Sequence, residues 1–248
     1  MADTPMAAET VTITGHGGDE IEAYFARPTS PGPHPGVVVI HHMPGYDRST
    51  KEIVRTFAVY GYSALCPNLF HRYAPGAAAG DAAKAAMEAG GVPDDQCVGD
   101  VLGAADYLRA LPSANGRVGV IGYCSGGRQS YVVACSLRLD AAIDCYGGRV
   151  VATPEELTPQ RPVAAIDLTP GLFCPLLGLF GANDTNPSPE QVAQIEDALR
   201  TNSKTYEFHT FENAGHAFFS VDRPNYSVDA SREGWKLIWD FFGRFLSA

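Results

Sequence analysis

A cysteine between two glycines is the residue of this sequence best placed to do chemistry. Cys124 has Gly122 two residues before it and Gly126 two residues after it, within the run Val-Gly-Val-Ile-Gly-Tyr-Cys-Ser-Gly-Gly at 118–127. A nucleophile on a sharp strand-to-helix turn needs such small neighbours, because a Cβ atom at either place would clash with the turn. The adjacent Ser125 has a tyrosine two residues before it. The spacing therefore favours the thiol of Cys124 as the nucleophile.

Two further residues stand where an acid and a base would complete this site. Asp184 follows the apolar run 176–180, and His216 follows the run 205–211, so each comes just after a predicted strand. In enzymes with this kind of turn the order along the chain is nucleophile, acid, histidine. We therefore expect Cys124 to attack a carbonyl carbon, His216 to carry the proton and Asp184 to orient the imidazole.

Other acids and thiols are less well placed for these roles. Asp140, Asp144 and Asp167 lie beside or within strand-like segments or in an irregular stretch. The cysteines other than Cys124 are scattered without a Cys-x-x-Cys pair, which indicates reduced thiols buried as small core residues. Two alternatives stay open on the same fold: a non-catalytic ligand-binding protein, and a thiol redox sensor. For the sensor, Cys135 lies too far along the following helix to be a resolving thiol.

Two backbone N–H groups are expected to hold the oxyanion that forms when a thiolate attacks a carbonyl. One comes from Ser125, the residue after the nucleophile, and the other from the loop at 41–46 after the third strand. Met43 is the expected donor of that loop, because its neighbour Pro44 has no N–H. The N-terminus of the helix that follows Cys124 is expected to stabilise the thiolate as well.

Strands and helices that alternate along the chain must position these residues. Period-two runs at 9–14 and 21–26, separated by glycines, predict a β-hairpin. The alternation beyond it predicts an α/β fold, a mostly parallel central sheet flanked by helices on both faces, with ligands bound at the carboxyl ends of the strands. The further expected strands cover 36–40, 62–66, 118–121, 141–145, 176–180 and 205–211, and the expected helices cover 49–60, 94–111, 127–137, 189–202 and 229–246.

The chain is predicted to form one domain over residues 1–248. Two stretches without strong periodicity, 76–91 and 149–170, interrupt the alternation, but the composition does not change across either of them. We expect the first to be a cap or loop excursion with helical character, and the second to be a long excursion over the active-site end.

The charge balance and the apolar pattern argue against several classes of partner. Lys and Arg number 18 against 28 Asp and Glu, a formal net charge of −10, and no basic run is present. Such a chain is not expected to bind nucleic acid or an anionic membrane surface. Residues 1–10 lack the basic and apolar regions of a secretion signal, and no apolar run approaches the length of a membrane span. We therefore expect a cytoplasmic protein.

Several short motifs occur together in one known family. They are Gly122 to Gly127, Cys66 to Phe70 with Arg72 and Ala74-Pro-Gly76, Gly181 to Asp184, and Gly215 to Phe218. With these motifs the chain resembles the dienelactone hydrolase family over about residues 20–246. The resemblance implies an α/β-hydrolase fold and a hydrolase of ester or lactone bonds in small molecules, with no cofactor and no metal, present as a monomer or weak homodimer. It also implies a triad of Cys124, Asp184 and His216, and it makes Arg72 a candidate substrate-binding residue.

One position departs from the family pattern. Members that open dienelactones carry a Gln-Glu pair after the third strand, whose carboxylate contacts the resting thiol, whereas this sequence has His41 and His42 there. Three roles stay open for His42: an alternative partner of the thiol, a substrate contact, and a structural residue. Metal binding by the two histidines is disfavoured, because adjacent side chains on a strand point to opposite faces.

Overall fold

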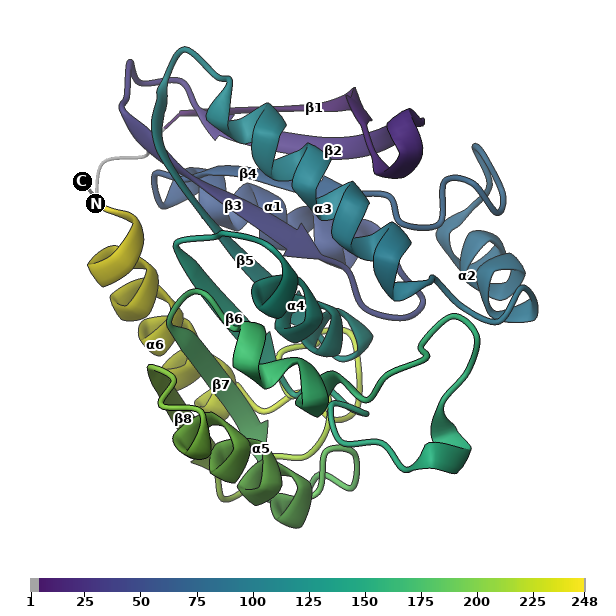
Figure 1. The fold of residues 1–248 in the computed structure, drawn as a ribbon. Coiled ribbons are helices and arrows are strands. Elements are labelled where there is room, and N and C mark those ends of the chain that lie inside the picture. The colour runs from purple at the N-terminus through teal and green to yellow at the C-terminus, as the bar shows by residue number, and fades with distance from the viewer. Residues whose placement is uncertain (1–4, 248) are drawn as a thin grey trace.

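An eight-stranded sheet runs through the centre of the computed structural model, which describes residues 5–247 (Figure 1). In chain order the strands are β1 (Met6–Thr14), β2 (Glu20–Pro28), β3 (His34–Ile40), β4 (Ser63–Pro67), β5 (Ala114–Tyr123), β6 (Ala141–Cys145), β7 (Leu176–Gly181) and β8 (Tyr206–Phe211). They lie side by side in the order β1-β2-β4-β3-β5-β6-β7-β8. β2 pairs antiparallel with both β1 and β4, and all other neighbours are parallel. The predicted mostly parallel sheet is confirmed.

Helices cover both faces of this sheet, as predicted. In chain order they are α1 (Arg48–Val59), α2 (Ala79–Glu88), α3 (Asp94–Arg109), α4 (Ser125–Ser136), α5 (Pro189–Thr201) and α6 (Val228–Leu246). α3, α4 and α5 bury apolar side chains in one core, and α1 and α6 bury theirs in a second core on the opposite face (Figure 1). Val38 and Ile40 of β3 belong to the first core, and Val37 and Val39 belong to the second. Burial on both faces explains the unbroken apolar run at 36–40.

The strand before Cys124 is longer, and the helix after it begins earlier, than the sequence pattern predicts. β5 begins at Ala114 instead of Val118, because four residues that are not buried, 114–117, extend the strand before its buried part. α4 begins at Ser125 instead of Gly127, since two glycines weaken the helical pattern of its first turn. Cys124 is consequently the residue that caps the N-terminus of α4.

Two excursions from the alternating pattern are joined to one another (Figure 1). Residues 76–91 contain α2, so the expected helical character is present there. The side-chain amide of Gln160 donates to the Ala89 carbonyl over 3.2 Å, and the Gln160 carbonyl accepts from the Asp94 N–H over 2.9 Å. The second excursion, 149–170, contains only two short 3₁₀ helices, η2 (Pro154–Glu156) and η3 (Ala165–Gly171).

Residues 1–4 and 248 lie outside the described residues, so the single domain over 1–248 stays a prediction. Among residues 5–247, no helix combines the length and the apolar character needed to cross a bilayer.

Candidate active site

Cys124 lies on a sharp turn between β5 and α4. Its backbone has a φ of 55° and a ψ of −118°, a conformation that residues with a side chain rarely adopt. The Cys124 N–H donates to the Cys145 carbonyl over 3.0 Å, and the Cys124 carbonyl accepts from the Gly127 N–H over 2.9 Å. The thiol is half-buried at the N-terminus of α4, where the helix dipole favours a negative charge.

The glycines on either side of this turn are required by close backbone contacts. A Cβ atom added at Gly122 would lie 1.8 Å from the Gly126 carbonyl oxygen, and one added at Gly126 would lie 2.4 Å from the Ile40 carbonyl oxygen. No side chain fits at such separations, so the turn between β5 and α4 excludes every residue except glycine at both positions. This is the steric reason for the Gly-x-Cys-x-Gly spacing.

His216 and Asp184 are paired on loops that follow β8 and β7. His216 Nδ1 lies 2.8 Å from Asp184 Oδ2. The Asp184 carboxylate is buried, and its other oxygen accepts the Asn186 N–H over 2.9 Å. The His216 ring also packs edge-on against Tyr146, with 5.2 Å between the ring centroids. With Nδ1 engaged by the carboxylate, Nε2 is the nitrogen available to a thiol or a substrate.

The imidazole of His216 is biased towards its protonated form. Burial disfavours the charge, but interactions with Asp184 and with Cys124 outweigh burial and raise the pKa of His216 to about 10. An imidazolium placed between a carboxylate and a sulfur is suited to an ion pair with a thiolate. The structure thus brings Cys124, Asp184 and His216 together from the carboxyl ends of the parallel strands β5, β7 and β8.

The two predicted oxyanion donors also lie beside the thiol. Met43 and Ser125 line the same cavity as Cys124 and His216. Within residues 5–247, neither the Met43 N–H nor the Ser125 N–H has a hydrogen-bond partner. Both groups are therefore available to an oxyanion.

The cavity beside Cys124 has a volume of ≈ 400 Å³. Its wall combines the start of α4 with the connection between α2 and α3 and with the 149–170 excursion. The periodicity of the sequence gives no signal for residues on the two excursions, because their approach to Cys124 depends on the tertiary fold. The polar lining residues that sequence analysis does not identify are Arg128, Gln129, Arg149, Arg161 and Asn186.

His42 does not line this cavity. Its Nε2 lies 2.8 Å from Oδ2 of Asp47, the residue that caps the N-terminus of α1. Burial raises the pKa of Asp47, but hydrogen bonds from His42 and from the Thr50 N–H outweigh burial and lower that pKa to about 2. His42 also borders a separate, small cavity with Tyr123 and Tyr146. Of the three roles left open by the sequence, this position favours the structural one.

His41 is buried and uses both ring nitrogens within the chain. Burial lowers the pKa of His41 to about 4, so the ring is neutral at pH 7. Nε2 accepts the Leu69 N–H over 3.3 Å, and Nδ1 lies 3.1 Å from the His42 carbonyl oxygen. The pair of histidines therefore does not present two free nitrogens to a metal ion.

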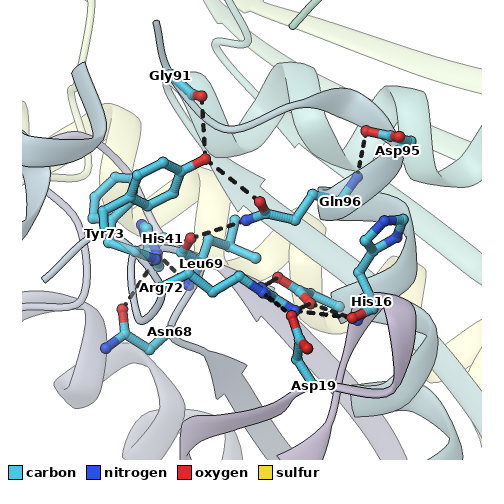
Figure 2. A network of polar contacts seen from close by, with 12 residues as sticks. His16, Asp19, His41, Asn68, Leu69, Arg72, Tyr73, Gly91, Asp95 and Gln96 are labelled. Carbon is cyan, nitrogen blue, oxygen red and sulfur yellow. Dashed lines mark hydrogen bonds and ion pairs between the residues drawn. The ribbon is translucent and has the colours of Figure 1, made fainter. Parts of the chain in front are cut away.

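Arg72 is held in an ion-pair network (Figure 2). It does not line the cavity of Cys124. Its guanidinium donates to both carboxylate oxygens of Asp100, over 2.9 and 3.0 Å, and to Asp19 over 2.7 Å. Asp100 is fully buried and also accepts the His16 N–H over 2.8 Å. The structure therefore places the candidate substrate-binding residue Arg72 where it fastens η1 (His16–Gly18) to α3.

Replacement of Arg72 by alanine is expected to lower the free energy of unfolding by about 3 kcal/mol, because the buried Asp100 carboxylate loses its counter-ion. Urea denaturation followed by circular dichroism measures this change. The matched control is Arg200→Ala, which breaks an exposed ion pair with Asp197 and should cost much less. An unchanged urea midpoint combined with a raised KM for esters would return Arg72 to substrate binding.

The sequence matches a known protein family over nearly its whole length. The model of the dienelactone hydrolase family matches residues 21–246. A Salmonella typhimurium protein, provisionally named a carboxymethylenebutenolidase, is 32% identical over 99% of this chain and 91% of its own length. The carboxymethylenebutenolidase of Pseudomonas putida is 29% identical over 91% of this chain and 92% of its own length.

A solved structure of a similar protein has the same fold as this chain. A protein of Klebsiella pneumoniae, provisionally named a dienelactone hydrolase, superposes with a TM-score of 0.87 at 27% identity, covering 97% of this chain and 100% of its own. The predicted α/β-hydrolase fold is thereby confirmed. Because the family model spans nearly all of the sequence, this chain belongs to the dienelactone hydrolase family.

Proposed function

We propose that this chain hydrolyses ester or lactone bonds of small molecules with Cys124 as the nucleophile. Membership of the dienelactone hydrolase family supports the hydrolase activity. The thiolate attacks the carbonyl carbon, the N–H groups of Met43 and Ser125 hold the oxyanion, and the tetrahedral intermediate collapses to a thioester. His216, oriented by Asp184, gives its proton to the departing alcohol. It then takes a proton from water, which cleaves the thioester and releases the acid.

The observation that carries this proposal is the pairing of His216 with Asp184, 2.8 Å apart, beside a cysteine on a positive-φ turn. A strained conformation at a polar, partly exposed side chain is typical of functional sites. A strained turn with an incidental cysteine would not need a buried acid-histidine pair next to it. No step of this chemistry requires a metal or a cofactor.

The burial of the other cysteines supports Cys124 as the nucleophile. Cys66, Cys97, Cys135, Cys145 and Cys174 are buried, and burial raises the pKa of each. A thiol with a raised pKa is a poor nucleophile at neutral pH. Among residues 5–247, Cys124 is the only cysteine with partial exposure, which also leaves a redox sensor without an accessible resolving thiol.

Trapping the acyl-enzyme tests the proposed reaction. After rapid acid quench of a reaction with p-nitrophenyl acetate, mass spectrometry of the peptides is expected to show one acetyl group on the peptide that contains Cys124. Hydroxylamine at neutral pH should remove that group, because thioesters react with it far faster than oxygen esters. An acetyl group that resists hydroxylamine and maps to Ser125 would overturn the thiol mechanism. A panel of short esters and lactones then ranks the substrates.

A further inference from the structure

A second cavity borders His216 without bordering Cys124. Its volume is ≈ 540 Å³. Its wall is formed by residues 183–185 after β7, by residues 213, 215 and 216 after β8, and by residues 224–227 before α6. Among residues 5–247, His216 is the only residue that lines both this second cavity and the first cavity, which lies beside Cys124. The imidazole therefore stands at the border between two cavities.

The lining of the second cavity is polar but offers no free charge. Within residues 5–247, none of its lining residues is a lysine or an arginine, and its one acid, Asp184, has a side chain that is 2% exposed and is paired with His216. Side-chain amides and hydroxyl groups supply the other polar atoms, and both kinds of group donate as well as accept hydrogen bonds. They belong to Asn183, Thr185, Asn213, Asn225, Tyr226 and Ser227.

Most of these polar groups are available to a ligand. In the part of the chain that the structure describes, the side chains of Asn183, Thr185 and Asn213 and the hydroxyl of Tyr226 make no hydrogen bond with other residues. Hydroxyl groups of a ligand replace water at such atoms with little loss of hydrogen bonding. An ionic ligand would lose its hydration without gaining an opposite charge. The lining therefore suits an uncharged ligand that carries several hydroxyl groups.

The three parts of this wall are fastened to one another. The Asn225 side-chain amide donates to the His216 carbonyl over 3.1 Å, which joins the segment before α6 to the loop after β8. The Asn183 N–H donates to the Ala214 carbonyl over 2.9 Å, which joins the loop after β7 to that same loop. A cavity whose walls are joined in this way loses little conformational entropy when a ligand binds.

We propose that the second cavity binds the alcohol part of the substrate and selects esters of a polyol, an uncharged alcohol with further hydroxyl groups. This inference rests on the proposed function, because His216 gives its proton to the departing alcohol. The alcohol oxygen must therefore lie at Nε2 of His216 when the C–O bond breaks. The thiol of Cys124 and the oxyanion donors Met43 and Ser125 hold the carbonyl group in the first cavity. The remainder of the alcohol then extends past His216 into the second cavity.

The same subsite gives the chain a second activity, which is acyl transfer to a polyol. A hydroxyl group of the polyol attacks the carbonyl carbon of the thioester on Cys124, and His216 takes the proton of that hydroxyl. A C–O bond forms, the C–S bond breaks, and the thiolate of Cys124 is restored as the new ester leaves. A polyol bound in the second cavity thus competes with water for the acyl-enzyme.

Two alcohols with the same three-carbon chain, glycerol and 1-propanol, provide the test. The acyl-enzyme is formed from p-nitrophenyl acetate with both alcohols present at equal concentration, and gas chromatography measures the glyceryl and propyl acetates. After subtraction of the reaction without enzyme and correction for the two primary hydroxyl groups of glycerol, the wild type should favour glycerol by about 10-fold, the gain expected from two hydrogen bonds. In the direction of hydrolysis, kcat/KM should favour glyceryl monoacetate over propyl acetate to a similar extent.

Two variants locate the preference in the second cavity. Thr185→Val removes a hydroxyl group and keeps the shape of the side chain, and Asn213→Ala removes an amide. Each should lower the preference for glycerol by about 3-fold. Because the preference is a ratio, any change in the rate of the chemical steps cancels. The matched control is Thr201→Val, which changes an exposed threonine at the end of α5 and should leave the ratio as in the wild type.

The outcomes for this inference and for the proposed function differ. Turnover that depends on Cys124, with equal transfer to both alcohols, would overturn the subsite and leave the hydrolase proposal standing. A preference for glycerol that persists in Thr185→Val and in Asn213→Ala would also overturn the subsite. Absence of turnover would overturn the hydrolase proposal. Saturation-transfer NMR signals of glycerol that are present with the wild type and weaker with Thr185→Val would in that case leave the polyol site standing.

Discussion

Replacement of Cys124 by alanine is expected to lower kcat/KM for p-nitrophenyl acetate by at least about 10⁴-fold. The thiol forms the bond to the acyl carbon, so its loss leaves only oxyanion binding and substrate positioning. Replacement by serine should also be severe, because the ion pair between a thiolate and His216 has no counterpart with a hydroxyl of much higher pKa. Initial rates with a chromogenic ester measure both variants, and circular dichroism confirms that they are folded.

A second cysteine variant shows whether the effect belongs to this thiol. Cys135 lies on the same helix, α4, but is buried in the core. Cys135→Ala should keep the wild-type rate, and iodoacetamide should inactivate it with one equivalent, at Cys124, as it does the wild type. Full activity of Cys124→Ala together with loss of activity in Ser125→Ala would move the nucleophile to the serine.

The turn between β5 and α4 that carries Cys124 could be predicted from the sequence, because the steric constraints on it are local. The steric limits at Gly122 and Gly126 arise from contacts within a few residues of Cys124 and with the neighbouring strand β3. The end of an apolar run likewise marks the end of a predicted strand. Asp184 and His216 each follow such a run, so the sequence places both at strand ends. The order of strands then brings these positions to one edge of the sheet, as a parallel topology requires.

The wall of the cavity could not be predicted in this way. Arg161 reaches it because Gln160 binds Ala89, a contact between positions 71 residues apart in an excursion with no periodicity. Arg72 illustrates the opposite case, since its motif suggested a substrate contact. The Arg72 guanidinium instead forms an ion pair with Asp100, a fully buried carboxylate of α3. Which partner a charged side chain finds is a property of the tertiary fold, and a single sequence does not state it.

Asp184→Asn is expected to lower kcat for an alkyl ester by about 10⁴-fold without unfolding the chain. The amide keeps the volume of the carboxylate, and its oxygen can still accept the Asn186 N–H. Its NH₂ group then faces Nδ1 of His216, so the ring is driven to the tautomer that carries its proton on Nε2. That tautomer cannot take a proton from the thiol or from water. Stopped assays with ethyl acetate or a lactone measure the loss.

The matched control is Asp167→Asn, which removes an exposed carboxylate of η3 and should leave the rate unchanged. The loss in Asp184→Asn should be smaller for p-nitrophenyl acetate, because p-nitrophenolate departs without being protonated by His216. Equal losses on alkyl and p-nitrophenyl esters would contradict the role of His216 as the acid for the leaving group.

Asp184→Asn should also shift the alkaline limb of the pH profile of kcat/KM. The pKa of His216 is raised to about 10 in the wild type, with Asp184 and Cys124 opposing the effect of burial. The imidazolium, and the stability it contributes, are therefore fully present below the unfolded pKa of about 6.5 and are lost as the pH rises through about 10. Removing the Asp184 charge lowers this pKa. The fall of kcat/KM for an alkyl ester at high pH should then begin at a lower pH in Asp184→Asn than in the wild type. An alkaline limb at the same pH in both proteins would show that the limb belongs to a group other than His216.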